Sequence, residues 1–582
     1  MESNKKDNYQ LTTKEIESIN EIDRTLKKIE NFTFNYSTIG FRYNENILDK
    51  LIFRAGIMAS ILSMSKGGLP IGIMITGGNN KSTDNGIKIS SDNGEMIKEE
   101  EKYFEEIINS QNLKDSINSI FSKLKPTQGK CIIIIGLDNR KSSKKFSEIL
   151  IKGLKCINNC SFNLYNIIPC PNLFFLTLLN QMAFQKIGLK YKMIFAPEDN
   201  YWIYLKHSCN KFHSYYNMIF KNKNQENNTK YENELCIDCS NGIGSLYKDK
   251  IKNIFNNEEN NFQLKISFIN DNNLDKEINN NCGINSILQN KIPINKKEKY
   301  SSIIKNATFS ADLDSSIYYI DNKDEKNGIK IIKGEKMIIL FCKMLDFLIN
   351  NFSKNLKIKY YEMVKMGIIT SWYCNQEFIS FYENNLKNNK YELTLVKTGM
   401  KNLQKAKDTK KYDISICYDY NGQGSIYISK ELTMKFGKLS SLIETSKDSQ
   451  IIELFQMFIA LFNSTTSDGI ANLLVIESIL KVMNLSINDV YNFYEDIPYK
   501  MVNIKVNNKN KFVTNEEDSK LLKPIEVKNK IEELINKYEK CRILIRPSLV
   551  EDYLKIYIES KSEEDNLEMV QIISKYLKEK NG

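Results

Sequence analysis

A unit of strand, polar turn and helix recurs along this chain and limits its fold more than any other feature. Residues 131–136 (CIIIIG) form a short, continuous apolar run, which is typical of a strand buried on both faces. The polar segment 138–143 (DNRKSS) follows almost directly, and a helical pattern then continues to about residue 155. This succession of elements is typical of doubly wound α/β domains.

Two further segments repeat this unit. In one, the apolar residues 235–238 precede the polar turn 240–245 and a helix. In the other, residues 307–309 and 317–320 flank an acidic loop and precede a helix at 335–350. We therefore expect three similar mixed α/β domains.

The C-terminal part of the chain has a different pattern. Strands are expected at 502–506, 542–545 and 554–558, with a helix at 525–538, which predicts an α+β domain. The fold class we predict is therefore α/β, with three mixed α/β domains followed by one α+β domain. Their predicted extents are residues 1–190, 191–298, 299–445 and 446–582.

The composition agrees with several soluble domains and argues against a nucleic-acid partner. A length of 582 residues is far beyond what one hydrophobic core supports. The net charge is +11, yet 82 basic residues accompany 71 acidic ones, so the excess is spread along the chain. Nucleic-acid binding would need clustered Arg with interleaved aromatic residues on one face. The basic residues are mostly Lys on many faces, and we expect no nucleic-acid partner.

Cysteine usage and hydropathy predict a cytoplasmic protein. The 12 cysteines follow no regular framework, which favours reduced thiols. The N-terminus lacks a signal-peptide core, and the longest apolar stretches, 337–350 and 451–462, are interrupted by charge or too short to cross a bilayer. We expect a monomer without a membrane partner. Cys236 and Cys239 form a CxxC pattern, but their odd spacing on a strand places the thiols on opposite faces and argues against a metal or redox pair.

A glycine loop at 76–81 (TGGNNK) is the strongest candidate for a functional segment. It follows the apolar run 71–75 and precedes the turn signal 84–86 (DNG) and a second short strand pattern. Adjacent glycines allow backbone angles that other residues avoid and let a ligand approach the main chain closely. Loops held at strand ends often hold functional residues, and we expect this loop to do so.

This loop is one of several segments whose order resembles that of the α-D-phosphohexomutases, in particular the eukaryotic phosphoacetylglucosamine mutases. The resemblance covers about residues 36–580 and is carried by the segments 38–42, 71–86, 138–143, 238–244, 312–314, 397–399, 421–424 and 546–548. It implies a four-domain phosphohexomutase-like architecture around a central cleft. It also implies interconversion of N-acetylglucosamine 6-phosphate and 1-phosphate, a step toward UDP-N-acetylglucosamine, with Mg²⁺ and a sugar 1,6-bisphosphate primer.

The first family loop has the pattern Thr-Ala-Ser-His-Asn-Pro, in which the serine carries the transferred phosphoryl group. Gly78 stands at the serine position, and glycine has no oxygen nucleophile. Asn79 stands at the histidine position and cannot exchange a proton near neutral pH. Ser82 and Thr83 are alternative phosphoryl carriers, although in-line transfer needs a carrier placed close to the substrate oxygen.

The second family loop, Asp-Gly-Asp-Ala-Asp-Arg, holds Mg²⁺ through carboxylates at alternating positions. In this chain the loop begins with Ser310, so only Asp312 and Asp314 remain as family metal ligands. The resemblance implies a weakened Mg²⁺ site at these two residues. The alternative is that both are solvated turn residues.

The third family loop, Glu-Ala-Asn-Gly-His-Gly, contacts the sugar. Its counterpart is segment 419–424, in which Asp419, Asn421 and Gln423 are the implied substrate-binding residues and Tyr420 adds bulk. The alternative for this segment is a plain hairpin turn around Asn-Gly.

The fourth family loop, Arg-Pro-Ser-Gly-Thr-Glu, binds the phosphate that does not react. Arg546 and Ser548 are retained, and Arg546 can offer paired donors to a phosphate. Leu549 and Val550 replace the Gly-Thr pair, which removes a hydroxyl and hinders close backbone approach. We therefore expect a weakened site for a phosphorylated N-acetylhexosamine.

Four charged residues complete the candidate catalytic set. They are Arg42, Asp138, Arg140 and Lys397. The resemblance implies that they support the catalytic cleft, and the alternative is that they form interdomain ion pairs.

These substitutions lead to alternative functions. The main hypothesis is a phosphoacetylglucosamine mutase homologue, an isomerase by family, whose catalysis is impaired because Gly78 replaces the phosphoserine. One alternative is an active mutase with a relocated phosphosite and a residual Mg²⁺ site. The other is a non-catalytic pseudoenzyme that binds a sugar phosphate or has a regulatory role.

Overall fold

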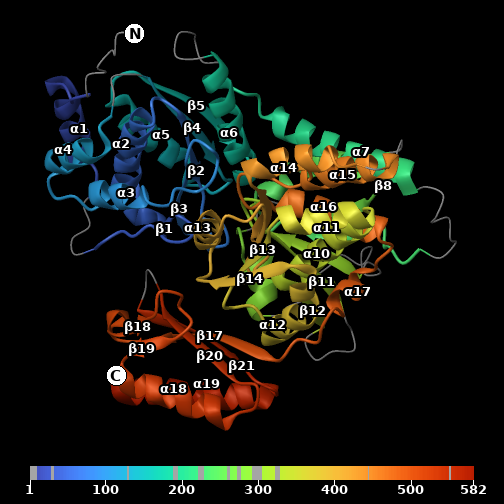
Figure 1. The fold of residues 1–582 in the computed structure, drawn as a ribbon. Coiled ribbons are helices and arrows are strands. Elements are labelled where there is room, and N and C mark those ends of the chain that lie inside the picture. Colours follow the sequence, from blue (N-terminus) through green and yellow to red (C-terminus); the bar gives the residue numbers. More distant parts are fainter. Residues whose placement is uncertain are drawn as a thin grey trace. The chain divides into compact units, whose positions relative to one another are not determined.

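The chain folds into two compact units, whose elements are labelled in Figure 1. Unit 1 consists of residues 1–214, 233–316 and 461–474, and unit 2 consists of residues 215–232, 317–460 and 475–582. This computed structural model describes residues 9–27, 32–126, 130–187, 195–220, 229–257, 262–271, 277–290, 304–321, 328–443, 445–548 and 552–581.

The first sheet of unit 1 is mixed and has the strand order β1-β3-β2-β4-β5. Its strands are β1 (Phe41–Asn44), β2 (Pro70–Ile75), β3 (Asp84–Ser90), β4 (Cys131–Leu137) and β5 (Cys160–Ile167). β2, β4 and β5 run parallel, whereas β3 is antiparallel to β1 and β2. Every residue of β2 and β4 is buried, as expected for apolar strands covered on both faces.

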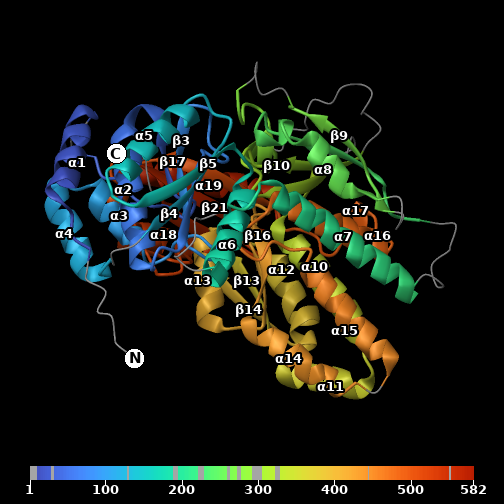
Figure 2. The ribbon, with the colours of Figure 1, turned by 90° about the horizontal axis from the view of Figure 1, so that it is seen from above.

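Helices surround this sheet, as Figures 1 and 2 show. They are α1 (Thr13–Thr25), α2 (Asp49–Ser65), α3 (Glu101–Ile108), α4 (Leu113–Leu124), α5 (Ser143–Lys155) and α6 (Cys170–Ile187), with the short helix η1 (Glu45–Ile47). α2 packs against α5 and β4, and α6 packs against β2 and β4. α2 is buried continuously over 51–64, because its sequence is apolar on all sides.

The remaining elements of unit 1 are built around a second group of parallel strands. β6 (Glu234–Asp238) pairs in parallel with β9 (Lys265–Ile269) and with β10 (Lys305–Phe309). The predicted boundary at residues 298 and 299 therefore falls inside one group of paired strands. The other elements that begin in unit 1 are α7 (Asp199–Phe220), η2 (Ile243–Ser245), α8 (Lys248–Phe255), β7 (Asn256–Asn257), β8 (Phe262–Gln263), α9 (Gly283–Asn285), η3 (Ser286–Asn290) and α16 (Gly469–Val482).

Unit 2 contains a four-stranded sheet in the order β14-β13-β15-β16. Its strands are β13 (Met366–Ser371), β14 (Tyr391–Val396), β15 (Ile414–Tyr418) and β16 (Gly424–Ile428). Outside this sheet, β11 (Ser316–Asp321) pairs antiparallel with β12 (Ile329–Ile332). β15 and β16 form an antiparallel hairpin, whereas β13 is parallel to β14 and β15. The helices of this part are α10 (Gly334–Asn350), α11 (Lys354–Met363), α12 (Gln376–Phe381), η5 (Tyr382–Leu386), η6 (Lys387–Asn389), α13 (Met400–Lys410), α14 (Lys430–Ser440), α15 (Ser446–Ile459) and α17 (Ile487–Tyr491).

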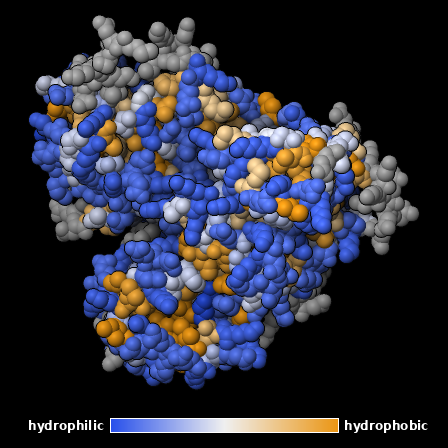
Figure 3. Space-filling view, viewed as in Figure 1, coloured by the Kyte–Doolittle hydropathy of each residue, from blue (hydrophilic) through white to orange (hydrophobic). Residues whose placement is uncertain are grey.

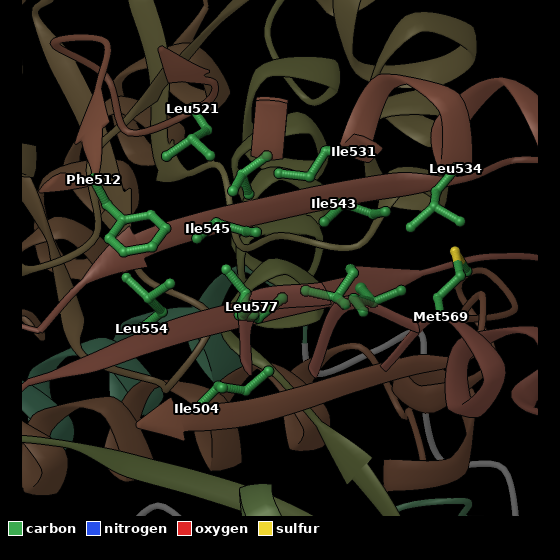
Figure 4. Packing of buried hydrophobic residues seen from close by; sticks show 14 of the residues in the cluster. Ile504, Phe512, Leu521, Ile531, Leu534, Ile543, Ile545, Leu554, Met569 and Leu577 are labelled. Carbon is green, nitrogen blue, oxygen red and sulfur yellow. The ribbon is translucent and has the colours of Figure 1, made fainter. Parts of the chain in front are cut away.

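The C-terminal part of unit 2 is an α+β module, as predicted. Its antiparallel sheet has the order β17-β21-β20. The elements are β17 (Tyr499–Lys505), η7 (Lys509–Lys511), β18 (Val513–Thr514), β19 (Leu521–Lys523), α18 (Ile525–Lys537), β20 (Arg542–Pro547), β21 (Tyr553–Glu559) and α19 (Glu563–Asn581). Figure 4 shows apolar side chains of the sheet, such as Ile543 and Leu554, packed with Leu534 of α18 and Leu577 of α19. The predicted fold class, mixed α/β with a C-terminal α+β part, is confirmed.

The surface agrees with a chain that is rich in charged residues. Figure 3 shows mainly hydrophilic residues on the visible face, with hydrophobic residues among them. In the described ranges, no helix combines the length and the apolar character needed to cross a membrane.

The C-terminal core provides a first prediction. Leu554 is fully buried between β17 and β20, so Leu554→Ala should destabilise the module by about 2–5 kcal/mol through the lost contacts and the cavity. Amide hydrogen exchange of β20 and β21, followed by mass spectrometry, should accelerate accordingly. Leu522, which is 45% exposed, is the matched control, and Leu522→Ala should leave the exchange unchanged. Equal protection in both variants would contradict the packing described here.

Candidate functional site

The glycine loop of unit 1 begins where β2 ends. The backbone N–H of Thr76 donates to the carbonyl of Gly86, which keeps the loop attached to β3. The N–H of Gly78 donates to the Thr76 hydroxyl over 2.9 Å, and that hydroxyl donates to Asp312 over 3.1 Å. Gly78 has a φ of +52°, a left-handed conformation that glycine adopts without strain. Both glycines of the loop are buried.

Arg140 lies in the space that a side chain at Gly77 would need. A Cβ atom on Gly77 would come within 2.4 Å of the Arg140 Cζ atom. The Nη2 group of Arg140 donates to the carbonyls of Gly78 (3.1 Å) and Asn80 (2.8 Å). Its Nη1 group pairs with Asp138, which also accepts from the Gly77 N–H over 3.1 Å. The Arg140–Asp138 ion pair therefore fixes the loop from inside the protein.

Two asparagines with no distinguishing sequence signal hold the same loop from another segment. Asn279 donates through Nδ2 to the carbonyls of Gly78 (2.8 Å) and Asn80 (2.7 Å). Asn285 donates to the carbonyl of Asn79 over 3.0 Å. Asparagine is so frequent in this chain that its composition gives no signal for these positions.

The segment that carries Asn279 is itself positioned by a buried carboxylate at the end of β6. Asp238 accepts hydrogen bonds from the N–H of Gly283 (2.6 Å) and the Thr308 hydroxyl (2.9 Å). Burial raises the pKa of Asp238 above its usual value, and the hydrogen bonds from these donors offset only part of that increase. Asp238 therefore connects β6, β10 and the segment that touches the glycine loop.

Gly78 faces a buried arginine and a buried aspartate. A Cβ atom on Gly78 would lie 3.6 Å from Asp312 Oδ2 and 3.7 Å from Arg42 Nη2, which are ordinary contact distances. Arg42 donates through Nη1 to the Thr76 carbonyl. Its Nε and Nη2 atoms and the Oδ1 atom of Asp312 are buried without a hydrogen-bond partner in the described part of the chain. Gly78, which the resemblance places at the phosphoserine position, thus lies next to unused donors that suit an anion.

The loop after β10 carries the two aspartates that the resemblance implies as metal ligands. Asp312 is fully buried and Asp314 is nearly so. The N–H of Cys170, the first residue of α6, donates to the Asp312 carbonyl over 3.0 Å. Leu313, between the two aspartates, has a φ of +65°. These aspartates are therefore not solvated turn residues, and the solvated-turn alternative is wrong on burial.

Lys88 of β3 lies between these carboxylates. Its Nζ atom is 2.8 Å from Asp312 Oδ2 and also contacts Asp314 Oδ2. Lys88 is paired with Met74 of β2, and paired residues project to the same face of a sheet. On that face Gly72 of β2 is covered by α6, so Lys88 points toward the side on which Asp312 is anchored.

Electrostatics favour the charged form of this cluster. Burial alone would lower the pKa of Lys88, but the carboxylates of Asp312 and Asp314 raise it above its usual range. Burial would raise the pKa of Asp312, but Lys88 and Arg42 hold it below its usual range. The cluster therefore contains Lys88 as a cation and Asp312 as an anion.

The residues present do not fit the Mg²⁺ ion that the family pattern implies. Both carboxylates bind Lys88, and Ser310, at the position of the first family carboxylate, donates its hydroxyl to Asp314 over 2.9 Å. Mg²⁺ needs near-octahedral oxygen ligands. Among the described residues, no three His, Cys, Asp or Glu side chains form a group that can hold a metal ion.

The alternative phosphoryl carriers lie in the turn before β3. The N–H of Asp84 donates to the Lys81 carbonyl over 3.1 Å and closes a turn that contains Ser82 and Thr83. Thr83 is exposed and Ser82 is half-buried, whereas Gly78 is buried. The two hydroxyls therefore lie in an environment that differs from that of the phosphoserine position.

In unit 2, the predicted sugar loop forms the turn of the β15–β16 hairpin. Asp419 accepts from the Ser371 hydroxyl (2.6 Å) and the Thr398 hydroxyl (2.5 Å), so its oxygens tie neighbouring strand ends together. Asn421 Oδ1 accepts from the N–H of Gln423 over 3.1 Å. The backbone of this segment is the hairpin turn that the alternative interpretation expects. Sugar binding by Asp419, Asn421 and Gln423 stays a prediction.

The predicted phosphate loop lies at the end of β20. The guanidinium of Arg546 is 5.4 Å from the centre of the Tyr373 ring, and its Nε atom is buried without a hydrogen-bond partner in the described residues. The N–H of Ser548 donates to the Tyr553 carbonyl over 2.7 Å. Leu549 and Val550 lie outside the described residues. Phosphate binding by Arg546 and Ser548 stays a prediction.

Lys397 forms an ion pair within unit 2. Its Nζ atom is 3.5 Å from Asp518, and 38% of its side chain is exposed. The two residues come from the predicted third and fourth domains. The contact is therefore of the kind expected under the alternative that Lys397 forms an interdomain ion pair. Arg42, Asp138 and Arg140 of unit 1 contact the loops as described above, and a direct catalytic role for all four residues stays a prediction.

Family models match two parts of the chain. The model "Phosphoglucomutase/phosphomannomutase, alpha/beta/alpha domain I" matches residues 102–184. The model "Phosphoacetylglucosamine mutase AMG1, domain III" matches residues 333–485.

Curated relatives match over almost the whole chain. The phosphoacetylglucosamine mutase of Candida albicans is 27% identical, and the match covers 95% of this chain and 97% of that protein. The Homo sapiens phosphoacetylglucosamine mutase is 25% identical, with 91% of each chain covered.

Solved structures of such enzymes have the same fold. An N-acetylglucosamine-phosphate mutase in its substrate complex has a TM-score of 0.82 at 25% identity, with 97% of this chain and 99% of that chain covered. An Aspergillus fumigatus enzyme in complex with glucose 1,6-bisphosphate has a TM-score of 0.85 at 22% identity, with 98% and 99% covered. The fold is that of an α-D-phosphohexomutase. Within this class, the chain belongs to the phosphoacetylglucosamine mutase family.

The clamp on the glycine loop can be tested by filling the space at Gly77. Gly77→Ala should displace Arg140 and lower the free energy of unfolding by about 1–3 kcal/mol, seen as a lower Tm. The same change should be less costly in an Arg140→Ala background, because the overlap is then absent. Gly437→Ala in α14, where a Cβ atom meets nothing within 4 Å, is the control and should not lower the Tm. Additive effects of the changes at Gly77 and Arg140 would contradict the clamp.

Proposed function

We propose that this protein is a phosphoacetylglucosamine mutase homologue that binds a phosphorylated N-acetylhexosamine but has lost most or all of its phosphoryl transfer. The observation that carries the proposal is Gly78, which stands at the phosphoserine position and offers no oxygen. Removing a covalent carrier typically costs many orders of magnitude in rate, because the reaction loses its intermediate. The free-thiol state of all 12 cysteines supports a cytoplasmic location for such a protein.

Retained donors support ligand binding in the absence of catalysis. Arg42 keeps two buried nitrogen atoms unpaired beside Gly78, and Arg546 keeps a buried Nε unpaired beside Tyr373. Buried cationic donors without partners are costly unless an anion satisfies them, and a phosphate group is a suitable anion. Related enzymes have been crystallised with N-acetylglucosamine 6-phosphate and magnesium and with glucose 1,6-bisphosphate.

An activity assay with phosphosite mapping tests the loss of catalysis. The purified protein should show no measurable turnover of N-acetylglucosamine 1-phosphate with Mg²⁺ and a sugar 1,6-bisphosphate primer. Mass spectrometry should find no phosphate on Ser82 or Thr83. Appreciable turnover together with phosphate on either hydroxyl would overturn the proposal in favour of a relocated phosphosite.

Restoring the family residues should return part of the activity. The triple variant Gly78→Ser, Asn79→His and Ser310→Asp supplies the nucleophile, the proton-exchanging group and the third carboxylate. A serine at φ +52° carries a backbone penalty of roughly 1–2 kcal/mol, so turnover should be detectable but low. The variant Asn79→His alone should stay inactive, because it lacks the nucleophile. Activity of this single variant would exclude the proposed cause.

Binding without catalysis can be measured separately by calorimetry with N-acetylglucosamine 6-phosphate. Arg546→Ala should weaken binding by about tenfold or more, because a charge-assisted contact to the phosphate is lost. Lys561, exposed and paired with Glu539, provides the control, and Lys561→Ala should bind as the unchanged protein does. If the unchanged protein binds no sugar phosphate, the binding part of the proposal fails.

A further inference from the structure

A single lysine lies at the centre of the loop that corresponds to the family metal site. Lys88 contacts both Asp312 and Asp314, and only 4% of its side chain is exposed. It comes from β3, whereas the aspartates follow β10, so the contact joins two separate groups of strands in unit 1. The ammonium group therefore lies between the oxygens that a metal ion would need.

Lys88 and neighbouring hydroxyls use three of the four carboxylate oxygens, and Asp312 Oδ1 is the one without a hydrogen-bond partner in the described residues. Thr76 donates its hydroxyl to the same Asp312 oxygen that Lys88 contacts. Ser310 and Ser315 donate their hydroxyls to Asp314 Oδ1 over 2.9 and 3.0 Å. A divalent ion would have to displace the ammonium group and compete with these hydroxyls for the carboxylate oxygens. The hydroxyls themselves are neutral and supply no negative charge to such an ion.

The charge balance leads to the same conclusion. Lys88 forms ion pairs with both Asp312 and Asp314, and Arg42 is a second buried basic residue beside Asp312 and Gly78. The cluster is neutral as it stands. A divalent ion would leave two positive charges in excess, since both the third carboxylate and the phosphoserine of the family pattern are absent. An uncompensated buried charge is strongly unfavourable.

We propose that Lys88 is the resident cation of this site and that the protein binds neither Mg²⁺ nor Mn²⁺ there. Lys88 replaces the divalent ion in its structural effect, because it neutralises both carboxylates and holds the loop after β10 against β3. The proposal describes the protein without a bound sugar phosphate, because a phosphate on Arg42 would add negative charge to this cluster.

Mn²⁺ is a suitable probe, because its binding is measured directly by electron paramagnetic resonance without any sugar present. The unchanged protein should show no saturable Mn²⁺ binding at Asp312. Any Mn²⁺ that it does bind should bind equally to the variant Asp312→Asn, because that binding would lie elsewhere. Lys88→Ala should create one Mn²⁺ site per chain, since it removes the ammonium group that contacts both carboxylates. Lys88→Arg, which keeps the positive charge, should bind no Mn²⁺.

Thermal unfolding provides a second measurement if Lys88→Ala is poorly folded. Mg²⁺ or Mn²⁺ should raise the Tm of Lys88→Ala and leave that of the unchanged protein where it is, because a ligand stabilises only the state that binds it. Lys145→Ala, which removes an exposed lysine paired with Asp49, is the matched control and should show no metal response. Stoichiometric Mn²⁺ binding by the unchanged protein that is lost in Asp312→Asn would overturn the proposal. A Lys88→Ala variant whose Mn²⁺ binding and Tm both stay unresponsive would also overturn it.

Discussion

Neutralisation of buried charge is the constraint on which the functional part of unit 1 depends. Asp312 and Asp314 lie in an interior where an unpaired carboxylate costs several kcal/mol. Lys88 supplies the compensating charge across 224 residues of sequence, and Arg42 supplies a second charge beside it. Because these groups come from β1, β3 and the loop after β10, their pairing fixes how the strands of the first sheet meet the second group of strands.

A second buried ion pair determines the shape of the glycine loop. Arg140 reaches the loop carbonyls only because Gly77 has no Cβ atom, and Asp138 orients the guanidinium from its other side. Glycine is thus needed at positions 77 and 78 for different physical reasons. Gly77 leaves space for a cation, whereas Gly78 adopts a left-handed backbone conformation and leaves the phosphoserine position without a hydroxyl.

The sequence predicted the elements and the location of the loops better than their internal contacts. The apolar run of β4 and the polar turn after it identified a strand–turn–helix unit, because burial on both faces and helix initiation leave local signals. The order of motifs then led to the predictions that Gly78, Asp312 and Arg546 stand at functional positions of the family. Apolar runs, polar turns and motif order are properties of short segments, so the sequence alone is enough to recognise them.

Contacts between distant segments were not predictable in the same way. Lys88 and Asn279 belong to residue types that are frequent along the whole chain, so neither stood out from its surroundings. The pairing of Lys88 with Asp312 depends on strand register, which places Lys88 opposite Met74 and on the side of the sheet covered by α6. The predicted boundary at 298 and 299 divided paired strands for a related reason, because the parallel pairing of β6 with β10 has no local sequence signal.

The substitutions in these loops form a physically consistent set. Losing a phosphoserine removes negative charge from the cluster, and replacing the first carboxylate by Ser310 removes more, so that one lysine is enough to balance what is left. A phosphorylated residue introduced at position 78 alone would add its charge next to Asp312 without a metal ion to compensate it. If Lys88 is the resident cation, catalysis in this scaffold needs the nucleophile, the third carboxylate and the divalent ion together, because each of them changes the charge balance of the cluster.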